Sequence, residues 1–269
     1  MIYQECNVTA EELFHVTEHG HEYVNPYFGC SEGCPFCYWT SIPGWEGQIS
    51  VRVNAVDVLK TKLPGWDKRR RLCIGSYCNP YEEVERKYRL TRGILEALRE
   101  YHIPFVLMTS SEFILDDAEL IASMKENATI VFELCRIRRL VIFQETGSHP
   151  VLDAANRLAR MGVPVLATLS PYLKGITDVE AVLEYLDERI PLYLGELDLE
   201  TNRTVAARLL PAVKIYREAY LQHYLWDIQD GHAKMEFEEI MKEYEGNPRI
   251  RRFPLDISYE NNEGGEHHG

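Results

Sequence analysis

Three cysteines, Cys30, Cys34 and Cys37, follow one another at the spacing C-x3-C-x2-C, and no fourth cysteine lies nearby in the sequence. Cysteines this close together are typical ligands of a metal centre. A structural zinc site requires four ligands, and each iron of a [4Fe–4S] cluster normally carries one thiolate. Three cysteines on such a cluster leave one iron open to a ligand that is not protein. The spacing therefore favours an open iron–sulfur cluster.

The residues around the cysteines suit a loop that wraps such a group. Gly29 and Gly33 permit unusual backbone dihedrals, and Pro35 restricts the turn. The neighbouring aromatic residues are expected to keep water off the cluster; they are Tyr27, Phe28, Phe36, Tyr38 and Trp39. A zinc site completed by a distant His or Cys remains open. A disulfide loop is disfavoured because the cysteine count is seven, which is odd, and nothing marks the chain as secreted.

Composition limits the classes of function. The chain has 269 residues and a net charge of −13, which disfavours a surface built to neutralise nucleic-acid phosphates. No apolar run approaches the ~20 residues that span a bilayer, and the N-terminus lacks a signal-peptide core. Cysteines without an export signal indicate a reducing, cytoplasmic environment. Two histidines near the end of the chain, His267 and His268, are weak candidates for a metal role.

Strands and helices alternate along the sequence. Strands are predicted at residues 21–29, 71–78, 103–108, 128–132, 163–169 and 191–195, with a short extra strand at 48–53. Helices are predicted at 54–63, with Asn54 as the N-cap, and at 81–101, 116–126, 150–161 and 178–188. Six such units predict an α/β fold, a partial (β/α)6 TIM-type barrel with its chemistry at the carboxyl ends of the strands.

The same pattern suggests how the chain is divided. Residues 1–20 are read as an N-terminal extension and residues 21–200 as the core. Residues 201–258 are expected to form a C-terminal helical extension, with helices at about 201–225 and 233–244. The polar, Gly-rich residues 259–269 are expected to form a disordered tail.

The cysteine loop, with an aromatic residue before its last cysteine, resembles that of the radical S-adenosylmethionine (SAM) enzymes. Beyond the loop, the runs at 51–54 (VRVN) and 78–85 (CNPYEEVE), followed by Thr91 and Arg92, resemble the branch typified by spore photoproduct lyase. The likeness spans about residues 22–200. It implies a [4Fe–4S] cluster held by Cys30, Cys34 and Cys37, with SAM on the open iron.

The resemblance also implies a reaction and a set of cofactor contacts. One electron from a flavodoxin or ferredoxin-type donor would cleave SAM to a 5′-deoxyadenosyl radical that abstracts hydrogen from a substrate. Ser76 and Asn79 fall where the family contacts the SAM amino group, although an ordinary Asn-Pro turn remains open there. Thr109, Ser111 and Glu133 are further expected cofactor contacts. Glu133 is also open to binding a substrate amine or pairing with a nearby arginine.

The sequence departs from that branch at several positions. Thr109-Ser110-Ser111 stands where the branch often has Thr-Lys-Ser, and Asp116-Asp117 where it has Arg-Asp. Glu133 replaces a small hydroxyl residue, and Arg136, Arg138 and Arg139 follow it. Arg136 or Arg138 is either a clamp for a carboxylate or phosphate or part of a solvated turn. These differences favour a substrate other than a thymine dimer in DNA.

Cys78 is a candidate catalytic residue. The branch places a hydrogen-donor cysteine near the end of its second strand; its place here falls on Ser76, with Cys78 two residues further along. Side chains two apart on a strand share a face, so Cys78 is expected to reach the same cavity. Simple packing remains the alternative, as it is for Cys6, Cys73 and Cys135.

Three functions are therefore carried forward. The first is a radical SAM enzyme acting on a small molecule, either an amino acid or a nucleoside-like compound. The second is a nucleic-acid lesion lyase of the spore photoproduct lyase type. The third is a non-catalytic zinc-binding scaffold.

Overall fold

The computed structural model describes residues 3–16, 21–37, 39, 46–75, 78–197, 203–230 and 232–253. Ser76, Tyr38 and the predicted tail at 259–269, with His267 and His268, lie outside the described residues.

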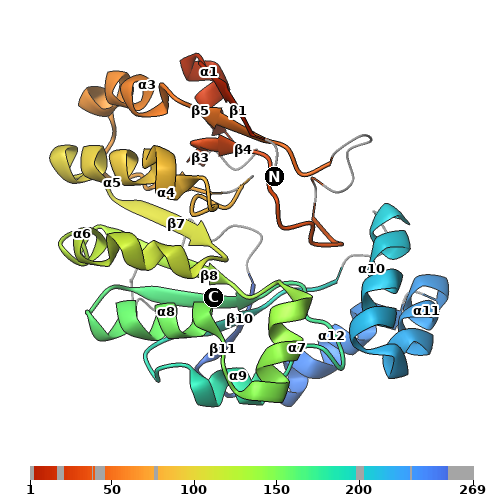
Figure 1. Cartoon of the computed structure of the whole chain (residues 1–269). Helices are drawn as coiled ribbons and strands as arrows, with labels where there is room; N and C mark the ends of the chain where they lie inside the picture. The colour runs from red at the N-terminus through yellow and green to blue at the C-terminus, as the bar shows by residue number, and fades with distance from the viewer. Residues whose placement is uncertain are drawn as a thin grey trace, which may run out of the picture.

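The central element is an eight-stranded sheet in the order β11-β10-β9-β8-β7-β6-β3-β2 (Figure 1). Its strands are β2 Phe14–Val16, β3 Glu22–Val24, β6 Leu72–Ile74, β7 Phe105–Thr109, β8 Ala128–Glu133, β9 Val165–Leu169, β10 Leu192–Leu194 and β11 Ile250–Arg252. All neighbours are parallel except β2 and β3. Each of the six predicted strands contributes one strand to this sheet, in chain order. The fold is therefore the predicted partial (β/α)-type barrel.

Helices cover the outside of the sheet because each presents one apolar face to it. They are α3 Ala55–Lys62, α4 Glu85–Tyr88, α5 Leu90–Tyr101, α6 Ala118–Ala122, α8 Pro150–Arg160 and α9 Val179–Tyr185, with short 3-10 turns η1 Leu63–Gly65 and η2 Glu112–Asp117. In α5 the buried residues recur at helical spacing, as Leu90, Ile94, Leu95 and Leu98. Ile94, Leu95 and Leu98 join the buried faces of β7 and β8 in one hydrophobic core, while Leu90 packs in a smaller cluster with Tyr27 and Val51.

The N-terminal residues belong to the packed structure. A three-stranded sheet in the order β1-β5-β4 consists of β1 Tyr3–Cys6, β5 Ile49–Arg52 and β4 Tyr27–Phe28. After helix α1 (Ala10–Leu13), β2 adds an antiparallel strand to β3. Asn54 precedes α3, but its side chain bonds the backbone of Val8 instead of capping the helix. The predicted extension therefore contributes strands to both sheets.

The structure corrects two predicted elements and adds a helix. Strand β6 ends at Ile74, not at residue 78. The helix predicted at 81–101 is broken at Arg89, which adopts a left-handed conformation between α4 and α5. Helix α7 (Ile137–Thr146) was not predicted, because the arginines at its start interrupt the apolar pattern.

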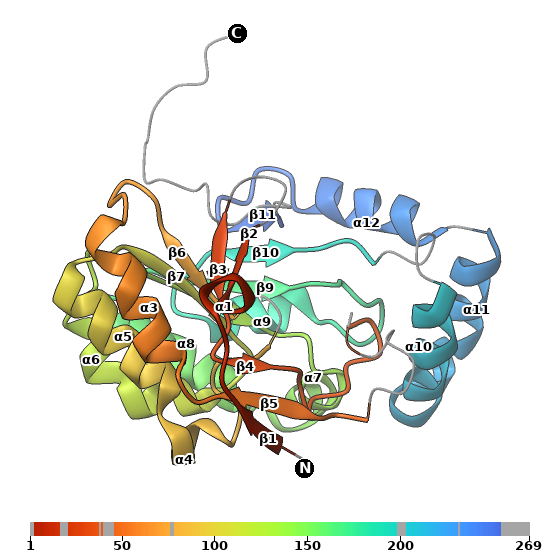
Figure 2. The same cartoon turned by 90° about the horizontal axis from the view of Figure 1, so that it is seen from above.

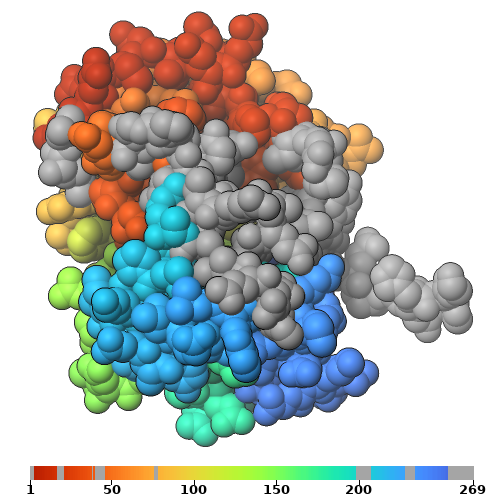
Figure 3. All heavy atoms as spheres, turned by 90° about the vertical axis from the view of Figure 1, so that its right-hand side faces the viewer, coloured from red at the N-terminus to blue at the C-terminus, as the bar shows by residue number. Residues whose placement is uncertain are grey.

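The C-terminal helices lie at the end of the sheet toward which its strands point. They are α10 Arg203–Tyr216, α11 Leu221–Asp230 and α12 His232–Glu243, with the turn η3 Glu218–Tyr220 between the first two. The single helix predicted at 201–225 is thus divided near Arg217, whose backbone is not helical. Figure 2 shows β9 and β10 pointing toward these helices, and Figure 3 shows α10 to α12 over the lower part of that face. No helix in the described part of the chain combines the length and apolar composition needed to cross a bilayer.

Candidate functional site

A cavity of about 240 Å³ lies at the carboxyl ends of the central strands. Its lining comes from the cysteine loop and from residues at or after the ends of β6, β7, β8 and β9: Cys30, Glu32, Cys34, Phe36, Cys37, Trp39, Gly75, Cys78, Asn79, Ser110, Glu133, Cys135 and Ser170. Parallel strands bring their carboxyl ends to one edge, so segments distant in sequence meet here. The three predicted cluster cysteines therefore share one cavity with Asn79, Glu133 and Cys78.

Cys135 is a fourth thiol beside the predicted cluster ligands. It donates a hydrogen bond to Cys34, which lowers the pKa of Cys34 and raises that of Cys135 well above its usual value. Burial raises the pKa of Cys30, whose sulfur accepts a hydrogen bond from the backbone N–H of Glu32 at 3.4 Å. Sequence reasoning assigned Cys135 to packing, because only the tertiary structure brings the end of β8 to the loop.

The cysteine loop is tied down on two sides by polar contacts. The hydroxyl and the backbone N–H of Ser31 donate to the buried carboxylate of Glu82 at 2.7 and 3.3 Å. Glu32 forms an ion pair with Arg136 at the start of α7. The loop is thereby attached to the segments that follow β6 and β8.

Asn79 is held with its amide group at the cavity. Its Oδ1 accepts hydrogen bonds from Thr109 Oγ1 at 2.7 Å and from the backbone N–H of Tyr81 at 3.1 Å. Its Nδ2 is buried and has no hydrogen-bond partner among the described residues. Leaving a buried donor unpaired costs about 1–3 kcal/mol, so this amide is suited to an oxygen acceptor from a ligand.

The other predicted cofactor residues of this region act differently. Thr109 is fully buried, and its hydroxyl orients Asn79. Ser111 caps the turn η2 by accepting a hydrogen bond from the N–H of Phe113 at 3.2 Å. Neither residue lines the cavity. Ser76, the remaining predicted contact, lies outside the described residues.

The sequence run at 78–85 forms a rigid support behind the cavity. The buried carboxylate of Glu85 accepts hydrogen bonds from Tyr27 Oη and from the backbone N–H groups of Thr91 and Arg92 at 3.0 and 3.1 Å. These two N–H groups belong to the first turn of α5, so Glu85 caps that helix from outside. Tyr27 lies three residues before Cys30, which links the helix to the base of the cysteine loop.

Glu133 ends β8 and faces the cavity. Burial raises the pKa of its carboxyl from 4.5 to about 7. The predicted pairing with a nearby arginine is not found: Arg136 pairs with Glu32, and Arg139 pairs with Glu112 at 2.7 Å. The exposed side chain of Arg138 lines a neighbouring cavity together with Arg136 and Arg139.

Cys78 reaches the cavity as predicted, but not because it lies on a strand. Strand β6 ends four residues earlier, so the alternation of side chains along a strand does not apply. Cys78 is 4% exposed, and its thiol donates a hydrogen bond to the carbonyl of Tyr27 at 2.7 Å. Burial raises its pKa to about 12, so this sulfur stays protonated.

The structure thus combines a parallel partial barrel with three loop cysteines at its carboxyl edge. Spore photoproduct lyase with bound AdoMet and dinucleoside spore photoproduct superposes with a TM-score of 0.56 at 14% identity, over 76% of this chain and 65% of that chain. A second spore photoproduct lyase structure, complexed with dinucleoside spore photoproduct, gives a TM-score of 0.55 at 14% identity, over 76% and 66% of the two chains. This chain therefore shares the fold of spore photoproduct lyase, and the predicted resemblance is confirmed at the level of the fold.

Sequence comparison adds relatives without a known activity. Uncharacterized proteins of Mycobacterium bovis and Mycobacterium tuberculosis are 30% identical over 118 residues, which is 40% of this chain and 34% of theirs. The match thus spans about a third of the length of these curated relatives. No family model matches the chain.

Proposed function

We propose that this protein is a radical SAM enzyme acting on a small-molecule substrate. The observation that carries the proposal is the cavity at the strand ends. There Cys30, Cys34 and Cys37 meet the carboxyl of Glu133 and the amide of Asn79, whose Nδ2 has no partner among the described residues. The three thiols would hold a [4Fe–4S] cluster, and the cavity beside them would hold SAM. When bound, the cluster supplies one electron for the reductive cleavage of SAM, and SAM supplies the carbon radical that removes hydrogen from the substrate.

The donor set fits a cluster better than a single ion. Around a tetrahedral zinc with Zn–S bonds of ~2.3 Å, neighbouring sulfurs lie ~3.8 Å apart. Among the described residues, no three cysteine sulfurs lie within 4.8 Å of one another. A larger, multi-iron group accommodates wider spacing.

The chain's own residues would bind and orient SAM. The Nδ2 group of Asn79 would donate a hydrogen bond to a SAM oxygen, with Thr109 fixing the amide orientation. Glu133 would accept from the ribose hydroxyls or from an amine. The buried aromatic ring of Trp39 and the half-buried ring of Phe36 would limit the access of water.

The final hydrogen donor is proposed to be Cys78. Its thiol lines the same cavity and its high pKa keeps the S–H bond intact. The S–H group suits this role because sulfur gives a hydrogen atom readily to a carbon radical.

The proposed substrate is an amino acid or nucleoside-like compound. The cavity is small, and the net charge of −13 opposes a phosphate backbone. An electron carrier of the flavodoxin or ferredoxin type is the proposed redox partner.

The test is anaerobic reconstitution with iron and sulfide, followed by reduction in the presence of SAM. We expect about four irons per chain, as a cubane cluster requires, and release of 5′-deoxyadenosine. The Cys34→Ala variant should lose the cluster and its broad visible absorbance. The control is Cys73→Ala, which changes a buried cysteine of β6 outside the cavity and should keep both. Normal iron content in the Cys34 variant would contradict the cluster assignment.

Cys135 gives the zinc-binding alternative a specific basis. With Cys30, Cys34 and Cys37 it would complete a four-thiolate site. Metal analysis separates the two functions: one zinc per chain, lost in Cys135→Ala, would establish the alternative and exclude the enzyme. Product analysis by mass spectrometry after incubation with a metabolite pool would identify the substrate, and salt-sensitive DNA binding would instead favour the lesion lyase.

A further inference from the structure

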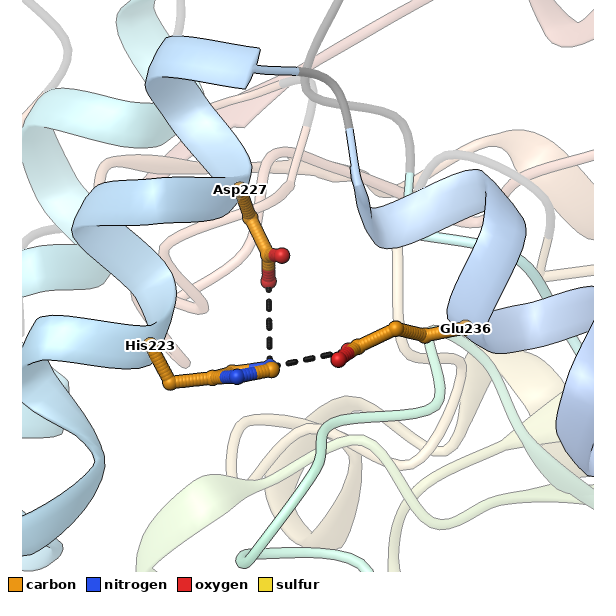
Figure 4. A group of neighbouring side chains, drawn as sticks. All are labelled: His223, Asp227 and Glu236. Carbon is orange, nitrogen blue, oxygen red and sulfur yellow. Dashed lines mark ion pairs between the residues drawn. The ribbon is translucent and has the colours of Figure 1, made fainter.

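Three side chains with metal-binding chemistry meet in the C-terminal helices, away from the cysteine cavity. His223 and Asp227 lie on α11 at the spacing i, i+4, which places them on one helix face. Glu236 approaches from α12. Figure 4 shows both carboxylates directed at the same edge of the imidazole ring.

The distances match the edges of a metal coordination shell. His223 Nε2 lies 2.8 Å from Glu236 Oε2 and 3.3 Å from Asp227 Oδ2. Ligand atoms that bind a metal at about 2.0–2.2 Å lie about 2.8–3.6 Å from one another in octahedral or tetrahedral geometry. One ion can therefore contact all three groups with little rearrangement.

Hydrogen bonding by His223 does not explain the position of its ring. His223 Nε2 is buried and makes no hydrogen bond of acceptable geometry with a described residue, even though two carboxylates lie within ion-pair distance. An N–H group on this nitrogen does not point at either oxygen. A lone pair on it, directed at a cation between the carboxylates, requires no such alignment.

The surroundings hold the three groups in place. Asp227 is only 3% exposed, so its carboxylate is held inside the protein beside the His223 ring. Lys174 contacts the other oxygen of Glu236, Oε1, at 3.0 Å and so orients the carboxylate from outside. Tyr224, next to His223, donates a hydrogen bond to the backbone carbonyl of Lys174 at 2.9 Å, which fixes α11 to this segment. Support of this kind is typical of residues behind metal ligands.

We propose that His223, Asp227 and Glu236 form a zinc site that joins α11 to α12. Imidazole nitrogen with two carboxylates is a set that Zn²⁺ accepts, and water would complete the coordination. The ion would stabilise the C-terminal helices at the face onto which the strands of the sheet point (Figures 2 and 3). The proposal does not depend on the proposed radical SAM function.

The test is a titration of the full chain with Zn²⁺ against a chromophoric chelator, and with Co²⁺ by absorbance. The protein used in all titrations carries His267→Ala and His268→Ala, so that these two histidines do not bind zinc. We expect one saturable zinc site per chain and a cobalt spectrum without the intense thiolate charge-transfer band that binding at the cysteine loop would give. Zinc should also raise the melting temperature, since it binds only the folded chain at this site.

Variants locate the site. His223→Ala and Glu236→Gln should each weaken zinc binding by at least about 100-fold, because even loss of a residue behind a ligand costs 10–100-fold. The control is Glu239→Gln, at an exposed position of α12, the helix that carries Glu236. This variant should bind zinc like the parent. Glu236→Gln preserves the size of a half-buried side chain and remains informative if His223→Ala does not fold.

Any of four results would overturn the proposal. The first three are no sub-micromolar zinc binding by the parent, unchanged binding by both variants, and a cobalt spectrum with thiolate bands alone. The fourth is a His223 ring that nuclear magnetic resonance shows to be doubly protonated near neutral pH with zinc present, which would assign the cluster to a plain ion pair.

Discussion

Replacing Glu133 by Gln should stabilise the protein at alkaline pH. The carboxyl faces the cavity at the end of β8, and burial raises its pKa from 4.5 to about 7. A raised carboxyl pKa means that the native state binds the proton more tightly than the unfolded chain does. The resulting stabilisation is complete below pH ~4.5 and is lost as pH rises through the native pKa. Gln is always neutral and does not undergo this loss.

The magnitude follows from the size of the shift. A difference of one pKa unit corresponds to ~1.36 kcal/mol, so a rise from 4.5 to about 7 corresponds to roughly 3 kcal/mol in full. Between pH 5 and pH 8 we expect about 2 kcal/mol, because part of the effect falls below pH 5 and water in the cavity screens the charge. The Glu133→Gln protein should gain this much stability over the parent across that interval.

The assay is urea unfolding at pH 5, 6, 7 and 8, with protein free of cluster and SAM. The matched control is Glu126→Gln, an exposed position just before the opposite end of the same strand. The stability difference between parent and control should not vary with pH. A Glu133→Gln difference that is equally constant would refute the conclusion that this carboxyl is desolvated.

Three further predictions concern the support of the site and the proposed hydrogen donor. Glu85→Ala should lower the free energy of unfolding by at least about 3 kcal/mol in urea titration, because Tyr27 Oη and two helix N–H groups lose a buried acceptor; an effect no larger than that of the exposed Glu83→Ala would contradict this. Gly75→Ala should cost at least about 2 kcal/mol, since its φ is +95° and a Cβ there would lie 2.5 Å from the carbonyl oxygen of Met108, whereas Gly65→Ala, with open space around it, is the mild control. Cys78→Ala should still form 5′-deoxyadenosine but lose or divert the product; an unchanged product rate and distribution, followed by mass spectrometry, would exclude Cys78 as the hydrogen donor.

The sequence by itself indicated the parallel βαβ units and the cysteine loop. Continuous apolar segments such as 103–108 and 128–132 can only be buried on both faces, which requires a parallel sheet covered by helices. Right-handed crossovers between them then leave few topologies, and the observed order of the six central strands is the simplest one. The spacing of Cys30, Cys34 and Cys37 indicated a shared ligand because short loops bring such residues together without help from the rest of the chain.

Only the tertiary structure decided which other residues belong to the site. Cys135 is almost 100 residues from the cysteine loop, and nothing in its local sequence distinguishes it from a packed cysteine. Thr109 and Ser111 looked equivalent in the sequence, yet one orients Asn79 and the other caps a turn. The arginines after Glu133 were candidates to neutralise it, but the loop residue Glu32 and the turn residue Glu112 pair with two of them. Pairing across strands depends on distances that local pattern does not encode, and the same holds for His223 and Glu236, which meet only because α11 and α12 pack side by side.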